Sequence, residues 1–164
     1  FMHTPFVWDL YDFFDTILLA KSESELYGAK FEFDYPYLMW DLFLKLSQQG
    51  KKSKNIRLNN TIRKIIKGEF QQPQEQNKKY YFIKENQKDG SEIRHELINV
   101  ASGIKYFGLL QVLAQRGHLG DKVVLIFDEP ENHLHPKWQL EFAKTICSLI
   151  KNINITIIVN SHSP

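Results

Sequence analysis

Apolar residues recur at helical spacing in the first part of the chain and gather into strand-like runs in the second part. Up to about residue 70, this spacing predicts three helices: one that opens at Thr4 and Pro5, one from Pro36 to about Gly50, and one from about Asn60 to Lys67. Aromatic residues at helical spacing are typical of a packed core. We therefore expect residues 1–70 to form a mainly helical arm or insert.

A linker and a β-hairpin are predicted next. Residues Gln71 to Asn77 are polar, as expected of a linker. The runs 79–84 and 91–98 flank Asp89-Gly90, a dipeptide that favours a tight hairpin turn. We expect this hairpin to belong to a second unit, residues 71–164.

A helix is predicted directly after the hairpin. It opens at Ser102 and Gly103 and runs to about Arg116, with Ser102 expected as its N-cap. The glycine would leave the first backbone amides of this helix unobstructed. A helix amino terminus of this kind is a ready binding site for an anion.

Two β-branched runs predict a parallel sheet in the second unit. The runs 123–127 and 155–159 are each typical of a strand that is buried on both faces of such a sheet. Between them, apolar spacing after Pro136 predicts a crossover helix to about Lys151. Strand, helix and strand form a βαβ unit, which brings the carboxyl ends of both strands to one edge. The chain is therefore predicted to be an α/β protein.

Polar side chains follow both strands at this edge. The first strand ends in Asp128 and Glu129, and His162 follows the second. Open α/β sheets bind their ligands at the carboxyl ends of the strands. Two adjacent carboxylates there are typical of a Walker B motif, in which one holds Mg²⁺ through water and the other polarises the water that attacks the γ-phosphate of ATP. Helicases also carry Asp-Glu at a strand end, so this pair alone does not identify the class of ATPase.

The three motifs together resemble an ABC-type ATPase head. They are the Ser-Gly-x-Lys helix, the strand with Asp-Glu-Pro-Glu and the strand that ends in Ser-His-Ser-Pro, and they span about residues 95–164. The resemblance is strongest to the branch that includes the OLD (overcoming lysogenization defect) family and RecF-like and SMC-like proteins. In that branch the segment after the catalytic glutamate commonly reads Glu-Pro-Glu-x-x-Leu-His-Pro, as residues 129–136 do here. His135 stands where transporter-type ABC proteins usually carry aspartate, which argues against a transporter subunit.

The resemblance implies a P-loop NTPase-like parallel sheet and a homodimer with ATP and Mg²⁺ sandwiched between two heads. It makes Asp128 the magnesium-linked Walker B aspartate and Glu129 the general base. It makes His162 the switch histidine that contacts the γ-phosphate. These three residues would serve the nucleotide bound to their own head.

The resemblance also implies residues that act on the partner's nucleotide. Ser102 and Gly103 would form the signature that reaches across the dimer. Residues 131–135 would form the D-loop, in which Asn132 and His133 are the candidate contacts. These roles follow from the family pattern and not from the spacing of the residues.

A phosphate-binding P-loop is absent from these 164 residues. That loop needs Gly-x-x-x-x-Gly-Lys-Ser/Thr, because backbone amides cradle the phosphates and the lysine neutralises them. Here Gly103 and Gly108 have the glycine spacing, but Leu109 and Leu110 follow. We therefore expect the chain to be the carboxyl-terminal part of a head, without its Walker A half. Alone it should bind ATP poorly and be inactive.

Charge is distributed unevenly along the chain. Residues 1–44 carry eight acidic and two basic side chains, whereas residues 45–94 carry five acidic and thirteen basic ones. The basic 45–94 segment could bind nucleic acid. Alternatively, it is a solvated surface that pairs partly with the acidic first segment. The longest apolar runs are about five residues and Cys147 is the single cysteine, so we expect a cytoplasmic protein without a membrane partner or an internal disulfide.

Three functional classes stay open on the sequence. The first is an ATPase of a defence or DNA-maintenance system that drives a separate effector protein. The second is an OLD-type nuclease, whose nuclease domain would lie beyond Pro164. The third is a scaffold that uses the head for dimerisation without hydrolysis.

Overall fold

The computed structural model describes residues 5–28, 37–50, 56–72, 79–85 and 90–162. Four sequence predictions therefore concern residues outside the described ranges: the opening of the first helix at Thr4, Pro36 at the start of the second, Asp89 in the hairpin turn, and most of the linker. The side chain of His133 is also outside the description.

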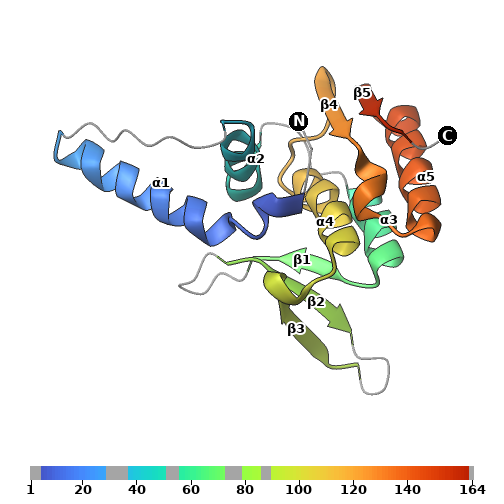
Figure 1. Cartoon of the computed structure of the whole chain (residues 1–164), viewed down its shortest axis with the longest axis horizontal. Coiled ribbons are helices and arrows are strands. Elements are labelled where there is room, and N and C mark those ends of the chain that lie inside the picture. The colour runs from blue at the N-terminus through green and yellow to red at the C-terminus, as the bar shows by residue number, and fades with distance from the viewer. Residues whose placement is uncertain (1–4, 29–36, 51–55, 73–78, 86–89, 163–164) are drawn as a thin grey trace.

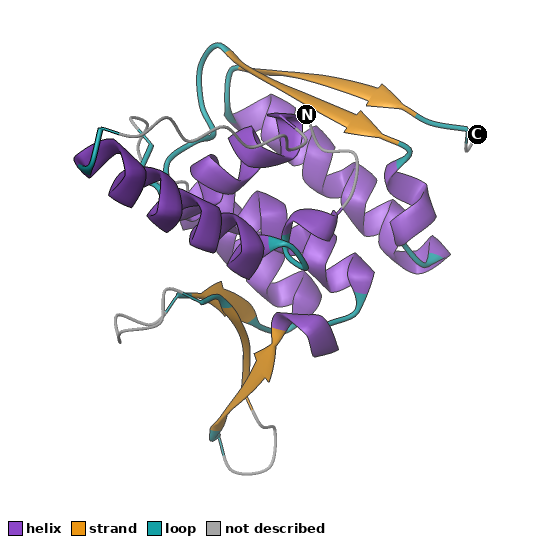
Figure 2. Cartoon of the chain, turned by 60° about the vertical axis from the view of Figure 1, so that its left-hand side comes forward, coloured by secondary structure: helices purple, strands orange, loops and turns teal. Residues whose placement is uncertain are grey.

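The central element is the helix α4 (Ser102–Gln115), which is buried along most of its length. The antiparallel strands lie on one side of it and the parallel pair lies on the other, as Figure 2 shows. Its neighbours include the helices α2 (Tyr37–Ser47) and α3 (Ile56–Ile66) and the strand β1 (Glu69–Gln71). The predicted helix is confirmed, but Ala101 is its N-cap and Ser102 is its first helical residue, without a side-chain cap.

The first part of the chain is helical, as predicted, with shifted boundaries. Pro5–Val7 forms a 3-10 turn, and the helix α1 (Tyr11–Leu26) begins only after it. Pro5 thus opens a helical turn, as predicted, but this turn is separate from α1, and the expected N-cap Thr4 lies outside the described residues. The helix α3 begins four residues before the predicted start at Asn60. The far end of α1 extends away from the body of the molecule (Figure 1).

The hairpin is confirmed as the strands β2 (Tyr81–Glu85) and β3 (Glu92–Glu96), which pair in antiparallel register. The short strand β1 extends this sheet and was not predicted, because three residues are too few to show a period. A 3-10 turn, Leu97–Asn99, links β3 to α4. The sheet approaches α4 closely at Gly108, where a Cβ atom would lie 2.5 Å from the Phe70 ring.

The βαβ unit is confirmed. The strands β4 (Val123–Asp128) and β5 (Ile155–Asn160) pair in parallel, and α5 (Pro136–Asn152) connects them, with Pro136 in its first turn. A 3-10 turn, Pro130–His133, lies between β4 and α5. The chain is thus an α/β protein with a parallel sheet, as predicted.

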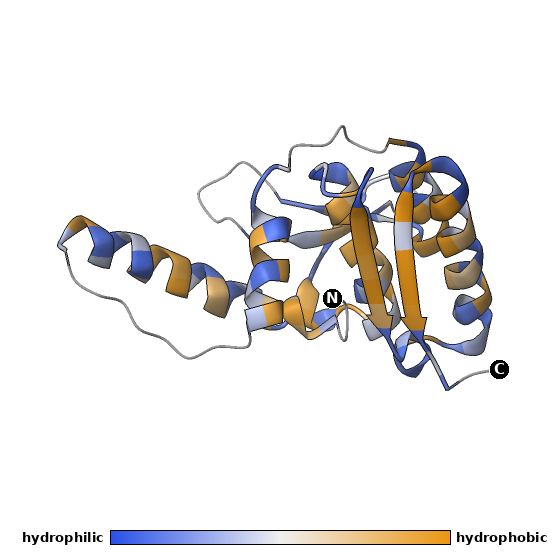
Figure 3. Ribbon diagram, turned by 90° about the horizontal axis from the view of Figure 1, so that it is seen from above, coloured by the Kyte–Doolittle hydropathy of each residue, from blue (hydrophilic) through white to orange (hydrophobic). Residues whose placement is uncertain are grey.

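Burial of these strands on both faces was a wrong prediction. Leu125 and Phe127 are buried, but Val124 is 53% exposed and Ile158 is 51% exposed. In the described part, the parallel sheet has two strands. Helices lie behind one face of this pair in Figure 3, and the strands in front of them are coloured mostly as hydrophobic. The β-branched composition therefore predicted the strands correctly but not the covering of the second face.

One cluster of buried residues runs through both predicted units, from Val7 to Ile155. Its amino-terminal part is rich in aromatic side chains. The term aromatic cluster is used below for these buried residues: Trp8, Tyr11, Phe14, Trp40, Phe43, Phe70, Tyr80 and Phe82. Trp8 stacks on Phe70 with ring centroids 5.2 Å apart. The division of the chain at residue 70 stays a prediction, but the core is continuous across it.

Candidate active site

The carboxyl ends of β4 and β5 meet in direct register. Asp128 is paired with Asn160 across the sheet. The Asn160 side-chain amide donates a hydrogen bond to Asp128 Oδ1 at 2.7 Å, and the Glu129 backbone amide donates to the Asn160 carbonyl at 2.8 Å. The pairing of β4 with β5 therefore fixes the positions of Asp128 and Glu129. We call Asp128, Glu129, Glu131, Asn160 and His162 the strand edge.

Glu129 has an unusual backbone conformation. Its φ is 46° and its ψ is 50°, which places it in the left-handed region. A residue with a Cβ atom adopts this conformation at a cost of roughly 1–2 kcal/mol, and such strain is concentrated at functional sites. The turn allows the chain to leave β4 sharply while the Glu129 carboxylate stays at the strand edge.

The Glu129 carboxylate joins two other predicted site residues. Its Oε1 lies 2.9 Å from His162 Nε2, and its Oε2 accepts a hydrogen bond from the Asn132 side chain at 2.7 Å. The Glu129 side chain is 36% exposed and that of His162 is 80% exposed, so both are accessible to a ligand. The predicted meeting of Glu129 and His162 is confirmed, while their catalytic roles stay predictions. Solvent screening limits what this exposed pair contributes to stability.

Glu131 holds the end of β5 in place. Its Oε1 accepts hydrogen bonds from the Ser161 hydroxyl at 2.8 Å and from the His162 backbone amide at 2.7 Å. Glu131 thus fixes the backbone that carries His162. The sequence predicted Glu131 only as part of a D-loop, and its hydrogen bonds to the residues that follow β5 were not predicted.

Two further residues at this edge were missed. Asn160 could have been found as the polar residue at the carboxyl end of the second strand, in the position equivalent to Asp128. Tyr106 of α4 is fully buried, and burial, with the nearby Glu131 and Asp128 carboxylates, raises its pKa. Nothing in the local pattern separates Tyr106 from the apolar residues around it.

Ser102 and Gly103, which are predicted to act in trans, lie apart from this network. In the described part of the chain, Ser102 and Gly103 make no side-chain hydrogen bond or ion pair with the strand edge. The lysine of the same motif, Lys105, is directed into the protein, where its side chain is 7% exposed and its ammonium lies 2.5 Å from Asp9. The Trp8 indole also donates to the Lys105 carbonyl at 2.9 Å. Lys105 therefore anchors the helix to the amino-terminal turn.

Two residues of the predicted D-loop have different structural roles. Asn132 orients the Glu129 carboxylate, as described above. His135 is the N-cap of α5, where its Nδ1 accepts a hydrogen bond from the Lys137 amide at 3.4 Å. This capping role was not predicted. The prediction for the His133 side chain cannot be compared with the described structure.

The strand edge suits a magnesium ion that is coordinated mainly by water and by the phosphates of a bound nucleotide. Mg²⁺ is commonly bound through one or two carboxylates together with water and substrate phosphates. Asp128 presents one such carboxylate, partly buried at the end of β4. Among the described residues, no group of three or more His, Cys, Asp or Glu side chains could hold a metal by itself. The donor set therefore suits an ion that arrives with phosphate oxygens.

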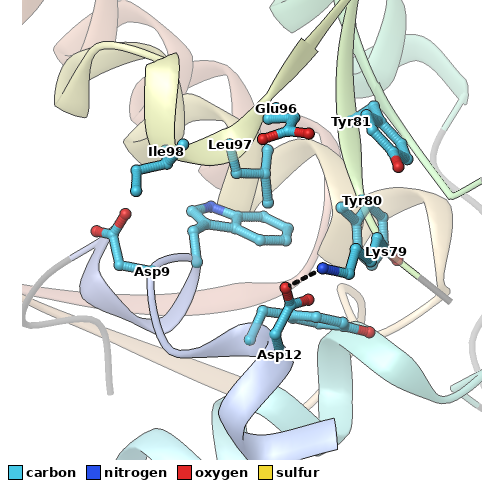
Figure 4. Close-up of a pocket in the computed structure, with 10 residues that line it drawn as sticks. Asp9, Asp12, Lys79, Tyr80, Tyr81, Glu96, Leu97 and Ile98 are labelled. Carbon is cyan, nitrogen blue, oxygen red and sulfur yellow. Dashed lines mark ion pairs between the residues drawn. The ribbon is translucent and has the colours of Figure 1, made fainter. Parts of the chain in front are cut away.

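One hollow adjoins the strand edge and another lies away from it. A cavity of about 510 Å³ adjoins the edge and is lined by residues that include Pro130, Glu131, Phe142 and Ser161. A smaller one, of about 260 Å³, lies between the amino-terminal turn and the antiparallel sheet, where Lys79 pairs with Asp12 at 2.6 Å (Figure 4). None of the predicted site residues lines the smaller hollow.

None of the helices in the described ranges combines the length and the apolar character that a membrane span needs.

Comparison with known proteins agrees with this architecture. A family model described as "AAA domain, putative AbiEii toxin, Type IV TA system" matches residues 5–164. A segment of 46 residues is 41% identical to Protein ea59 of Escherichia phage lambda, and it covers 28% of this chain. That segment spans 9% of the length of the phage protein. The family match is therefore the broader of the two, because it extends over nearly the whole chain.

Proposed function

The chain belongs to this AAA-domain family, and on that premise we propose that it carries the hydrolytic residues of an ATPase. The observation that supports this most directly is the Glu129 carboxylate at the end of β4, next to Asp128 and 2.9 Å from His162. A strained backbone holds this carboxylate in an exposed position. That combination is typical of a functional residue and adds little to stability.

Glu129 is the proposed general base. Bound Mg-ATP would supply the electrophilic γ-phosphate, and Asp128 would hold the ion through water. Glu129 would accept a proton from the attacking water, and Asn132 would keep the carboxylate oriented through its 2.7 Å hydrogen bond. His162 is exposed enough to turn from Glu129 toward the phosphate. Most of the catalysis would come from positioning and electrostatics, as is general for phosphoryl transfer.

The finer assignment is an OLD-like ATPase that works as an ATP-sandwich homodimer. It is supported by the match of residues 129–136 to the OLD-like pattern and by the position of Ser102 and Gly103 at the start of a helix. These two residues would contact the nucleotide of the partner head. A phosphate-binding loop would come from outside these 164 residues. In this proposal hydrolysis would drive an effector protein, in a defence or DNA-maintenance system.

Glu129→Gln tests the proposal in the intact protein. The substitution keeps the shape of the side chain but removes the base, so ATP turnover should fall by about 10²- to 10⁴-fold. Light scattering with and without Mg-ATP should show a dimer that persists in the variant. Glu141→Gln is the matched control, because Glu141 is a surface carboxylate of α5 that pairs with Lys144. Turnover of Glu129→Gln equal to that of the control would exclude Glu129 as the base.

Ser102→Arg tests the role in trans. A large cation in place of the serine should block the dimer interface and abolish turnover, while ATP binding to the monomer is retained. Isothermal titration with Mg-ATP measures the binding. Loss of binding by the monomeric variant would contradict a role across the dimer.

A further inference from the structure

The helix α3 carries an unbalanced positive charge on its exposed side. Arg57, Arg63, Lys64 and the residue after the helix, Lys67, are all exposed, and no acidic residue lies between Ile56 and Lys67. Arg63 lies 3.6 Å from Glu69. In the described part of the chain, Lys64 and Lys67 have no ion-pair partner. Among the described residues of the basic segment, the charge is most concentrated on this helix.

Two other described cations of the 45–94 segment form ion pairs with acidic residues. Lys45 pairs with Asp41 within α2, and Lys79 pairs with Asp12 of α1. The latter pair is the contact expected if the basic segment were neutralised by the acidic amino-terminal region. Lys84 belongs to the strand β2 and not to α3. The α3 face is therefore a separate feature, and neutralisation by the acidic segment does not account for it.

The dipole of α3 favours three of its four cations, and the fourth, Arg57, has a different environment. Cations near the carboxyl end of a helix interact favourably with the helix dipole, which accounts for Arg63, Lys64 and Lys67. Arg57 is the second residue of α3, where the same dipole disfavours a cation, and no acidic residue occupies the first turn. Its guanidinium donates a hydrogen bond to the neutral side-chain amide of Asn152 at 3.2 Å. Asn152 is the last residue of α5, so Arg57 also lies at the carboxyl end of that helix, where a cation is favoured.

The cations form a stripe along the helix. Arg57 and Lys64 are seven residues apart, which places them on the same side and about 10 Å apart along the axis. The opposite side of α3, with Leu58, Ile62 and Ile66, is buried in the core. The polar residues Asn60 and Thr61 lie between the two cations and are exposed.

We propose that the exposed face of α3 binds the phosphate backbone of a nucleic-acid duplex, without reading its sequence. A duplex carries about one negative charge per 1.7 Å of its axis, so a basic stripe of this length meets several phosphates. The apolar side of α3 is buried and cannot insert into a membrane, as an interfacial helix must. The described face has no aromatic side chain on which unpaired bases could stack, which favours a duplex over a single strand. This proposal is independent of ATP hydrolysis.

The test is the salt-dependent binding of a labelled duplex of mixed sequence to the full protein, measured by fluorescence anisotropy. Arg57→Gln/Lys64→Gln should weaken binding at least about tenfold near 100 mM salt and reduce the salt slope by about 2. Lys45→Gln/Lys79→Gln is the matched control, because it removes the same charge from the same segment at two exposed lysines that pair with Asp41 and Asp12 and not from α3. The control should bind within about twofold of the wild type, since it leaves the stripe intact. Circular dichroism should show that both variants stay folded, because all four side chains lie at the surface.

Two outcomes would overturn the proposal. The first is equal weakening by the two double variants, which would mean that net charge and not the α3 face determines binding. The second is no duplex binding by the wild type, whether or not the protein binds phosphatidylserine vesicles. ATPase activity is not a readout here, so failure of this proposal leaves the proposed hydrolysis untouched.

Discussion

The aromatic cluster and the strand edge lie on opposite sides of α4 and are held together by different interactions. In the aromatic cluster, rings contact one another at centroid distances such as 5.0 Å between Tyr11 and Phe43, and the residues are almost inaccessible to solvent. At the strand edge, side chains bind one another through short hydrogen bonds while still facing solvent, as Glu129 and His162 do.

This difference separates stability from function within a small protein. The aromatic cluster depends on volume and burial, so its substitutions should change the free energy of unfolding. The strand edge depends on the register of two strands and on one strained residue, so its substitutions should change chemistry more than stability. The following predictions test this separation.

Phe70→Ala should have the largest effect. Phe70 is fully buried, stacks on Trp8 and fills the space beside Gly108. Removing a buried phenylalanine ring typically lowers the free energy of unfolding by about 3–5 kcal/mol. Urea denaturation measures the loss, and Tyr37→Ala, at an exposed position of α2, should change it by less than about 0.5 kcal/mol. Similar losses in both variants would show that the aromatic cluster is not the main source of stability.

Alkaline pH should weaken the aromatic cluster selectively. Burial raises the pKa of Tyr80, and burial together with the neighbouring Tyr80 raises that of Tyr11. In the unfolded chain both would ionise near the ordinary value of 10.0. The folded state holds these protons more tightly, so their contribution is complete below about pH 10. It is lost above that pH by about 1.4 kcal/mol per pH unit for each tyrosine.

Urea denaturation on both sides of pH 10 measures this slope. Tyr11→Phe should make the slope shallower, whereas the exposed Tyr37→Phe should leave it unchanged. An unchanged slope in Tyr11→Phe would mean that this hydroxyl is hydrated in the folded protein.

The strain at Glu129 can be measured by comparing two substitutions. Glu129→Ala and Glu129→Gly both remove the carboxylate, but only glycine adopts the left-handed conformation without cost. Glycine should therefore give the more stable protein by about 1–2 kcal/mol, the reverse of the usual order. Lys122, with φ of 65°, offers a control pair away from the strand edge in which the same order is expected. Equal stability of the two Glu129 variants would show that the backbone is not strained there.

Asn160→Ala should have the smallest effect on stability. It removes the hydrogen bond to Asp128, which is worth about 0.5–1.5 kcal/mol at most sites and should lie near the lower limit at an exposed one. Thermal unfolding measures the change. Thr156→Ala, at an exposed position earlier in β5, is the control and should cost less. A larger loss in the control would place the stabilising contribution in the strand and not at its end.

The sequence predicted most of the fold because its local patterns agree with the tertiary structure. The run that ends at Phe127 and the helix that opens at Pro136 are strong local signals, and the structure follows them closely. The strand β1 and the late start of α1 were missed for a physical reason. Both depend on contacts with distant residues, such as the bond from the Phe70 amide to the Gln111 side chain at 2.8 Å.

The candidate site was predictable only where residues follow strands. Asp128, Glu129 and His162 could be placed together because parallel strands end at a common edge. The hydrogen bonds of Glu131 and the pairing of Asn160 with Asp128 depend on strand register, which the sequence does not specify. The inward direction of Lys105 depends on Asp9, which is 96 positions away.

The contacts of Lys105 also set an order of assembly. Its carbonyl and its ammonium bind residues 97 and 96 positions earlier in the chain, so two ends of a long loop must meet before α4 is anchored. Closing such a loop costs conformational entropy before any contact offsets it, and contacts between distant residues slow folding. During synthesis, these two contacts of the amino-terminal turn therefore cannot form until Lys105 has left the ribosome. The helix that presents Ser102 becomes fixed late, when the beginning of the chain returns to it.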